Sequence, residues 1–166
     1  MQTLQHTLAP VYDAHSRVLV LGSFPSPQSR ETGFYYGHPQ NRFWQVLAAV
    51  FGRPVPASVE EKKTLLLENG VALFDVCRSC EIHGASDASI RNAVPNDLTP
   101  LLTASRITRV CCNGKTSFRL YSRLIEPVTG LPARCLPSTS PANAAWTLAR
   151  LTEAYRILRE PEPAHL

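Results

Sequence analysis

The stretch Arg17-Val18-Leu19-Val20-Leu21, followed at once by Gly22-Ser23, decides the fold class. It is a short apolar run of strand-compatible residues that ends at a glycine, as a buried β-strand often does. Three further runs of this kind follow, Val71–Val76, Ile107–Cys112 and Ala133–Leu136. The segments between the runs have helical spacing, and this alternation of strand and helix predicts an α/β fold, with a parallel sheet and helices on both of its faces.

Helical spacing is clearest in four segments, each bounded by residues that start or stop a helix. The first three helices are expected from near Asn41 to Gly52, from about Ser58 to Glu68, and from Gly114 to Pro127. The last helix is expected to begin at Pro141, because proline suits the first helical position. Its buried stripe would hold Ala145, Leu148, Leu151, Tyr155 and Leu158.

A chain of 166 residues, 44% hydrophobic and 18% charged, is long enough for one domain with a core and too short for two. We expect that domain to span residues 1–160. Prolines end the last helix after Glu160, so residues 161–166 are expected to be a disordered tail. No apolar run approaches the roughly 18 to 20 residues that cross a bilayer, and the first residues do not resemble a signal peptide. We therefore expect a cytoplasmic protein without a membrane partner.

The cysteines indicate neither a disulfide framework nor a metal site. There are five, an odd number, so reduced thiols are expected. Cys77 and Cys80 have the spacing of half a zinc or iron–sulfur site, but no second pair completes it. We expect no metal.

The charge pattern is compatible with nucleic acid as a partner. The formal net charge is +4, which permits such binding without requiring it. The placement of the charges is more informative, because the segment from Arg106 to Arg134 carries six Lys and Arg residues against Glu126 alone.

Ligands of an open parallel sheet bind outside the carboxyl ends of its strands, so the loops after the four runs are the expected site. Gly22-Ser23 allows a backbone to approach a ligand closely, and Tyr35 and Tyr36 offer flat faces on which a base could stack. The serines and amides of Ser138–Ala142 are good phosphate ligands.

Each of these features also has a purely structural interpretation. Ser140 and Asn41 are plausible helix N-caps, and the tyrosines could be core residues. Asn113-Gly114-Lys115-Thr116 is similar to part of a phosphate-binding loop, but Arg109 occupies the position of its first glycine, so a nucleotide triphosphatase is rejected.

Two segments together resemble known motifs. The stretch from Gly33 to Trp44 is similar to the Gly-x-Gly-Phe…His-Pro-x-Asn-x-Phe-Trp segment of mismatch-specific uracil and thymine glycosylases. It is closer still to the Tyr-Tyr-x-His-Pro-x-Asn-x-Phe-Trp form of hypoxanthine-DNA glycosylases. Leu136–Ser140 resembles the second motif of the uracil-DNA glycosylase superfamily, a Pro-Ser loop that grips DNA. With Val71–Cys77 and Asn113-Gly114, the resemblance covers most of residues 17–150.

The resemblance implies a single three-layer α/β/α domain with a central, mostly parallel four-stranded sheet. It also implies a monomeric, monofunctional DNA glycosylase that turns a deaminated base out of DNA and hydrolyses its bond to the sugar. Hypoxanthine is the expected base, with uracil and xanthine as further candidates. No cofactor is implied, and the lack of an amine nucleophile implies an abasic product without strand cleavage.

One position departs from the superfamily pattern. Where this chain has Phe24, most members have an Asp or Asn that positions the attacking water. The hypoxanthine branch shares this loss, and there the Asn of the His-Pro-x-Asn segment takes over, which carries the catalytic role onto Asn41. An amide is not a useful base near neutral pH, so Asn41 would hold water by hydrogen bonds and add electrostatic stabilisation.

The resemblance divides the remaining site residues into two groups. The base would be bound by Gly22, Ser23, Phe24, Tyr36, Asp75 and Asn113, with Tyr36 stacked on it. The DNA would be bound by Pro25, His38, Lys115, Ser138, Thr139, Ser140, Pro141 and Ala142. For three of these residues another role stays open: Asp75 could cap a loop, Lys115 could start a helix, and His38 could be a general acid or, as its spacing favours, make a structural hydrogen bond.

Three alternatives remain. A glycosylase acting on uracil in G:U mismatches or single strands could use the same motifs. A protein that binds damaged bases without cutting would explain Phe24. An α/β enzyme that does not act on DNA would share only the sheet pattern.

Overall fold

Four parallel strands form the centre of the molecule in the order β3-β2-β6-β7. The computed structural model describes residues 3–83 and 86–160, so the expected tail at 161–166 lies outside the described residues. The strands are β2 (Val18–Gly22), β3 (Val71–Asp75), β6 (Arg109–Asn113) and β7 (Ala133–Leu136). Each begins and ends within one or two residues of the run that predicted it, so the sequence-based sheet is confirmed.

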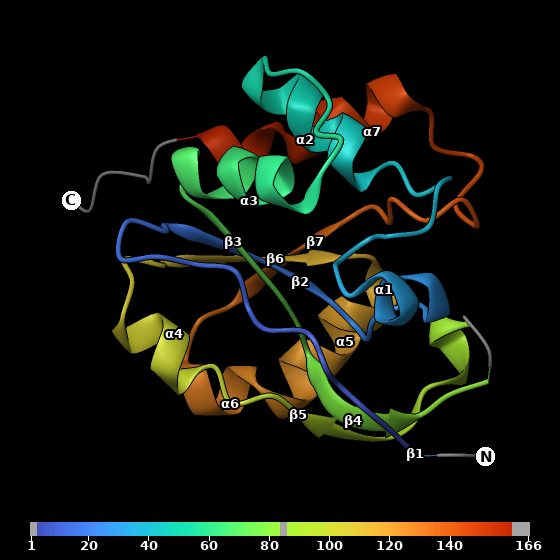
Figure 1. Cartoon of the computed structure of the whole chain (residues 1–166). Helices are drawn as coiled ribbons and strands as arrows, with labels where there is room; N and C mark the ends of the chain where they lie inside the picture. The colour runs from blue at the N-terminus through green and yellow to red at the C-terminus, as the bar shows by residue number, and fades with distance from the viewer. Residues whose placement is uncertain (1–2, 84–85, 161–166) are drawn as a thin grey trace.

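The sheet lies between two layers, as Figure 1 shows. One layer consists of α2 (Phe43–Phe51), α3 (Val59–Glu68), α7 (Leu148–Tyr155) and the 3-10 turn η2 (Arg156–Arg159). The other contains α4 (Thr99–Thr103), α5 (Lys115–Leu124) and α6 (Glu126–Thr129). The expected three-layer α/β/α domain is therefore confirmed. None of the described helices combines the length and the apolar character needed to cross a membrane.

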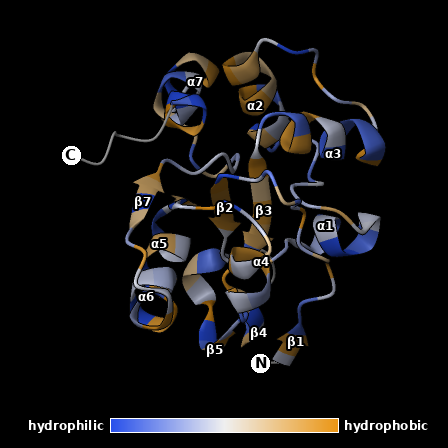
Figure 2. Ribbon diagram, turned by 90° about the vertical axis from the view of Figure 1, so that its left-hand side faces the viewer, coloured by the Kyte–Doolittle hydropathy of each residue, from blue (hydrophilic) through white to orange (hydrophobic). Residues whose placement is uncertain are grey.

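Burial explains why β2 occupies a central place in the sheet. All five of its residues are buried, and it is hydrogen-bonded to β3 on one side and β6 on the other. A strand without polar alternation is stable only where both faces are covered. Figure 2 shows the hydrophobic colour concentrated on β2 and β3 between the layers.

A second, smaller sheet was not predicted. It is antiparallel and joins β1 (Thr3–Gln5), β4 (Cys77–Glu81) and β5 (Arg91–Pro95) in the order β1-β4-β5. Its strands are short and mix buried with exposed residues, and the β4–β5 register shifts twice, so no regular alternation marks them. Two further short elements, α1 (Pro27–Thr32) and the 3-10 turn η1 (Asp87–Ser89), lie in connections near the carboxyl edge of the main sheet.

Three of the expected helices are confirmed, and the start of the fourth is wrong. The last helix begins at Leu148 with Thr147 as its N-cap, not at Pro141, and Ala145 and Leu148 are exposed. Arg42 supplies the physical reason. Its guanidinium donates hydrogen bonds to the backbone carbonyls of Ser140, Asn143 and Trp146, which fixes this segment as turns.

Candidate active site

A cleft of about 1000 Å³ opens at the carboxyl edge of the main sheet. The segments at the ends of all four parallel strands line it, as expected for an open α/β sheet. Every residue that the sequence predicted for the site lies along its wall, including Asn41, Tyr36 and Ser138. The cleft also takes in residues from η1 and the turn before α7.

Asn41 is held in one orientation at the start of α2. Its side-chain Oδ1 accepts hydrogen bonds from the backbone N–H of Phe43 at 3.0 Å and from the hydroxyl of Thr139 at 2.8 Å. Both lone pairs of the oxygen are therefore used. Among the described residues none accepts a hydrogen bond from its Nδ2, so the amide nitrogen is the polar group that Asn41 offers to the cleft.

Thr139 links Asn41 to Asn113 at the end of β6. The Thr139 backbone N–H donates to Asn113 Oδ1 at 3.1 Å, and Asn113 Nδ2 donates to the Thr139 hydroxyl at 3.0 Å. Because the hydroxyl accepts from Asn113, its own hydrogen is free to point at Asn41. Thr139 is fully buried and Asn113 nearly so. Asn113 thus positions the loop after β7, and its bonds to Thr139 use Oδ1 and one hydrogen of Nδ2.

Glycines allow the loops to approach one another at two points. A Cβ on Gly114, whose φ is 99°, would lie 3.3 Å from Cβ of Ser138. A Cβ on Gly22 would lie 2.5 Å from Oδ1 of Asp75 and 3.0 Å from the hydroxyl of Tyr36. A side chain at position 22 would displace the Asp75 carboxylate or the Tyr36 hydroxyl, and one at position 114 would press on Ser138 from a strained backbone, so the glycines let these groups lie close together.

Tyr36 stands beside this floor in a left-handed backbone conformation, with φ at 53°. Its ring stacks on Phe43 with centroids 4.1 Å apart, so one face is covered. Its hydroxyl is buried and has no hydrogen-bond partner among the described residues. Burial, and then the charge of Asp75, raise the pKa of Tyr36 well above its usual value, so the hydroxyl stays protonated.

Asp75 has a partner that sequence analysis missed. Its Oδ2 lies 2.9 Å from Nε2 of His6, and the two side chains are 5% and 3% exposed. The partners are 69 positions apart in the sequence, and His6 precedes the first predicted element. No local pattern could have revealed this contact.

Asp87 is a further residue of the site, in a segment whose sequence resembles an ordinary polar connection and gave it only the weakest indication of a role. It lies in η1 and lines the cleft. The residue as a whole is exposed, and part of it lines the cleft. Burial there raises the pKa of Asp87, Asp75 raises it further, and the Ser23 hydroxyl opposes the shift.

The predicted DNA-contacting residues form the rim. Lys115 is exposed at the start of α5, and Pro141 and Ala142 lie in the turn opposite. Nδ1 of His38 accepts a hydrogen bond from the backbone N–H of Gln40 at 3.0 Å, which is the structural bond that its spacing favoured. Of the six basic residues between Arg106 and Arg134, Lys115 alone lines the cleft.

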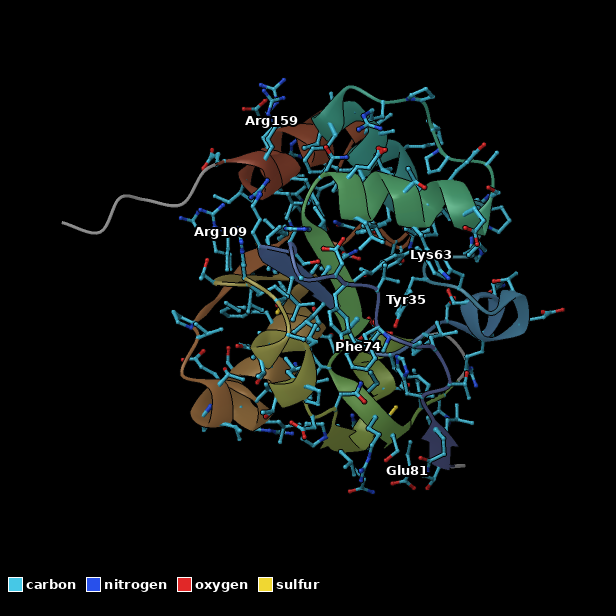
Figure 3. All side chains as sticks on the ribbon, turned by 60° about the vertical axis from the view of Figure 1, so that its left-hand side comes forward. Tyr35, Lys63, Phe74, Glu81, Arg109 and Arg159 are labelled. Atoms are coloured by element: carbon cyan, nitrogen blue, oxygen red, sulfur yellow. The ribbon has the colours of Figure 1, made fainter. Side chains whose placement is uncertain are left out.

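A smaller hollow of about 470 Å³ lies elsewhere on the chain, and its lining includes Arg17 and Arg159. Both arginines donate hydrogen bonds to backbone carbonyls, Arg17 to Leu158 and Arg159 to Val50. Figure 3 shows Arg109 and Arg159 at one side of the molecule, away from Tyr35 and Phe74 beside the cleft. The arginines of this hollow thus hold η2 in place.

Within residues 3–83 and 86–160, no three His, Cys, Asp or Glu side chains gather as metal ligands. Cys77 and Cys80 are both buried, and all five cysteines are free thiols. The cleft is lined by amides, hydroxyls, aromatic rings and two carboxylates. Such a set can bind a planar polar ring and orient water beside it.

Comparison with known proteins defines the class. The family model of the uracil DNA glycosylase superfamily matches residues 9–159, nearly the whole chain. The fold and the cleft are therefore those of a DNA glycosylase. The chain belongs to the uracil DNA glycosylase superfamily, and the resemblance read from its two motifs is confirmed.

The most informative relatives have a common name. A hypoxanthine DNA glycosylase of Methanosarcina acetivorans is 30% identical over 151 residues, which cover 90% of this chain and 94% of the relative. One from Methanosarcina barkeri is 31% identical over 136 residues, covering 81% and 85%. A solution NMR structure from M. acetivorans, named for uracil DNA glycosylase, has a TM-score of 0.78 at 26% identity and covers 96% of this chain and 100% of its own.

Proposed function

We propose that this protein removes hypoxanthine from DNA by hydrolysis of the bond between base and sugar, leaving an abasic site. The names of the two Methanosarcina relatives support the choice of base. The observation that carries the proposal is the cleft shared by Asn41, Tyr36 and Ser138, because it joins a polar group, a flat ring and a phosphate-binding loop. A base stacked in duplex DNA can reach such a cleft only after it is turned out of the helix.

Asn41 is the catalytic residue of this proposal. As the bond breaks, positive charge develops on the sugar and negative charge on the departing base. With Oδ1 occupied by Phe43 and Thr139, Asn41 acts as a donor through Nδ2. Nδ2 donates a hydrogen bond to one lone pair of the attacking water. The other lone pair of the water oxygen is then free to attack the sugar carbon. A fixed donor costs no reorganisation during the reaction.

Tyr36 and Asp75 form the base pocket. The Tyr36 face turned away from Phe43 would stack on the extruded base. Oδ2 of Asp75 is bound by His6, and Oδ1 lies toward Gly22 at the floor of the cleft. Oδ1 would therefore accept a hydrogen bond from the edge of the base. Backbone groups of Gly22 and Ser23 would also form hydrogen bonds to the edge of the base. Phe24 would form an apolar wall of the pocket.

The loop Ser138–Ala142 would hold the DNA strand. Its shape is fixed from within by Ser138 Oγ, which accepts from Ser140 N–H at 3.1 Å, and from outside by Arg42. Lys115 at the facing rim would neutralise a phosphate. A rigid loop can press on the strand and fill the gap left by the base.

Base release from synthetic duplexes tests the proposal. Wild-type protein should release hypoxanthine from a duplex containing deoxyinosine, and Asn41→Ala should lower the single-turnover rate by about a hundredfold or more. Gln45→Ala is the matched control, because Gln45 is an exposed amide on the same helix. Wild-type protein that binds the duplex and releases no base would overturn the proposal.

Uracil is the second candidate base. Uracil has an N–H donor at N3 next to a carbonyl acceptor at O4, and hypoxanthine has the same pair at N1 and O6. A pocket in which the Asp75 carboxylate accepts from the N–H therefore suits both bases. The name of the Methanosarcina NMR structure favours it as well. Parallel rates on inosine- and uracil-containing duplexes rank the two.

The proposal includes a monomer in the cytoplasm. One chain supplies all the groups of the cleft, so a second copy is not needed for catalysis. The five free thiols fit a reducing compartment. Sedimentation of the purified protein, alone and with DNA, tests the monomer.

A further inference from the structure

We propose that His6 is a positioning residue of the base pocket: it holds the Asp75 carboxylate aimed at the base edge, and so sets selectivity for a ring that offers an N–H. This inference rests on the proposed function. It names a residue that lies outside both sequence motifs. His6 acts through Asp75 and need not touch the substrate.

His6 is tightly confined. The centroid of its ring lies 5.2 Å from that of the Phe74 ring and 6.0 Å from that of the Phe24 ring, and both contacts are edge to face. The centroid of the Tyr35 ring is 6.3 Å away. Figure 3 shows Tyr35 and Phe74 close together on this side of the molecule. With its side chain 3% exposed, the imidazole cannot turn toward solvent without breaking this packing. Three aromatic neighbours therefore fix the direction in which Nε2 points.

Asp75 needs such a donor. A buried carboxylate without a hydrogen-bond donor tends to take up a proton and so lose its use as an acceptor. Among the described residues no lysine or arginine pairs with Asp75, and His6 Nε2 at 2.9 Å is its side-chain partner. In the proposed arrangement Nε2 of His6 donates and Oδ2 of Asp75 accepts. The bond uses Oδ2 and leaves Oδ1 as the acceptor.

An acceptor fixed at this place discriminates between bases. Hypoxanthine carries a hydrogen at N1, which Asp75 can accept. Adenine presents a lone pair at N1, which would face the carboxylate and be repelled. Sites that match hydrogen-bonding groups reject an analogue far more strongly than apolar pockets do, because the mismatched buried group stays unpaired. A carboxylate that turned freely would lose this discrimination.

The segment that carries His6 is anchored independently of the pocket. Tyr35 donates from its hydroxyl to the carbonyl of Ala9 at 2.8 Å, and Val11 N–H donates to the carbonyl of Leu73 at 2.9 Å. The fold can therefore hold this segment without the His6–Asp75 bond. A substitution at His6 can thus be separated from loss of the segment. His15→Asn serves as the matched control, because His15 is an exposed histidine that lines the smaller hollow and not the cleft.

The test compares His6→Gln with His6→Asn. Glutamine can place an amide N–H where Nε2 lies, whereas asparagine is too short to reach Oδ2. We expect His6→Asn to lower single-turnover release of hypoxanthine about a hundredfold and His6→Gln less than about tenfold. Affinity for an undamaged duplex should not change in either variant. The ratio of the release rate of hypoxanthine to that of adenine should narrow in His6→Asn and stay near the wild-type value in His15→Asn.

A double-mutant cycle makes the test specific. In an Asp75→Asn background, His6→Asn should lower the rate by less than about twofold, because its partner is already lost. Equal rates for the Gln and Asn variants, with unchanged base selectivity, would overturn the inference and leave His6 a packing residue. An inactive wild-type protein would instead contradict the proposed function, so the two failures are distinguishable.

Discussion

The hydroxyl of Thr139 donates a 2.8 Å hydrogen bond to Oδ1 of Asn41, although the two residues are 98 positions apart. The bond joins the loop after β7 to the start of α2, across the cleft edge. It leaves Nδ2 as the atom of the Asn41 amide that can act in the proposed reaction. The loop proposed to hold the DNA and the amide proposed for catalysis therefore form one unit.

Replacement of Thr139 tests this unit. Thr139→Val keeps the shape and removes the hydroxyl, so Asn41 loses a donor and Asn113 Nδ2 an acceptor. We expect base release to slow at least about tenfold and unfolding free energy to fall by about 1–3 kcal/mol, the cost of a buried unpaired group. Thr139→Ser retains the hydroxyl and is the control. Single-turnover rates and denaturant unfolding give both values, and an unchanged Val variant would show that the bond is not needed.

Arg42 should control the mobility of the DNA loop. Its guanidinium reaches the carbonyls of Ser140, Asn143 and Trp146, a fork that lysine cannot reproduce. We expect Arg42→Lys to speed amide exchange in residues 141–147 and to weaken DNA binding about tenfold. Hydrogen exchange and fluorescence anisotropy measure the two effects. Arg53→Lys is the control, because Arg53 makes an exposed pair with Glu68 away from the cleft.

We expect the negative charge of Asp87, which appears as the pH rises, to weaken the binding of DNA. Its pKa is raised by burial, so its proton is lost at a higher pH than that of an ordinary aspartate. Below that raised pKa the carboxyl is neutral, and above it the cleft holds a charge that repels phosphates. We expect Asp87→Asn to bind DNA more tightly than wild type at neutral pH, with the difference vanishing on acidification.

Affinities for an undamaged duplex, measured from neutral to acidic pH, check this sign. A difference between Asp87→Asn and wild type that stays constant across the range would mean that the Asp87 charge is not involved. Asp97→Asn is the control, since Asp97 is exposed and does not line the cleft.

The sheet could be predicted from the sequence because its signal is local. Each strand of the main sheet is a continuous run, such as Val18–Leu21, and the carboxyl-edge rule then placed Asn41, Tyr36 and Ser138 in one cleft. His6 and the start of α7 could not be predicted in this way. Both depend on contacts between distant segments, His6 with Asp75 and Arg42 with the backbone near Trp146.

The surroundings of Phe24 give a physical reason for proposing Asn41, and not this position, as the catalytic residue. Phe24 stands where most of the superfamily has an acidic or amide residue, yet it is 6% exposed, edge to face with His6 at 6.0 Å, and under Arg30 at 5.8 Å. An aspartate there would leave a charge buried close to the His6–Asp75 pair and a void beside His6. The Phe24 side chain therefore packs with the core at the wall of the cleft, which supports the proposal that Asn41 holds the water.

The packing around Phe24 should make its replacement by aspartate, one of the two residues found there in most of the superfamily, unfavourable. We expect Phe24→Asp to lower unfolding free energy by about 3 kcal/mol or more and to leave the Asn41→Ala variant inactive when the two are combined. Phe24→Leu, which keeps an apolar side chain, should retain most of both stability and activity. Denaturant unfolding and single-turnover release measure the outcome. Recovery of base release in the double variant would show that the strand end can still position water, and that Asn41 is dispensable.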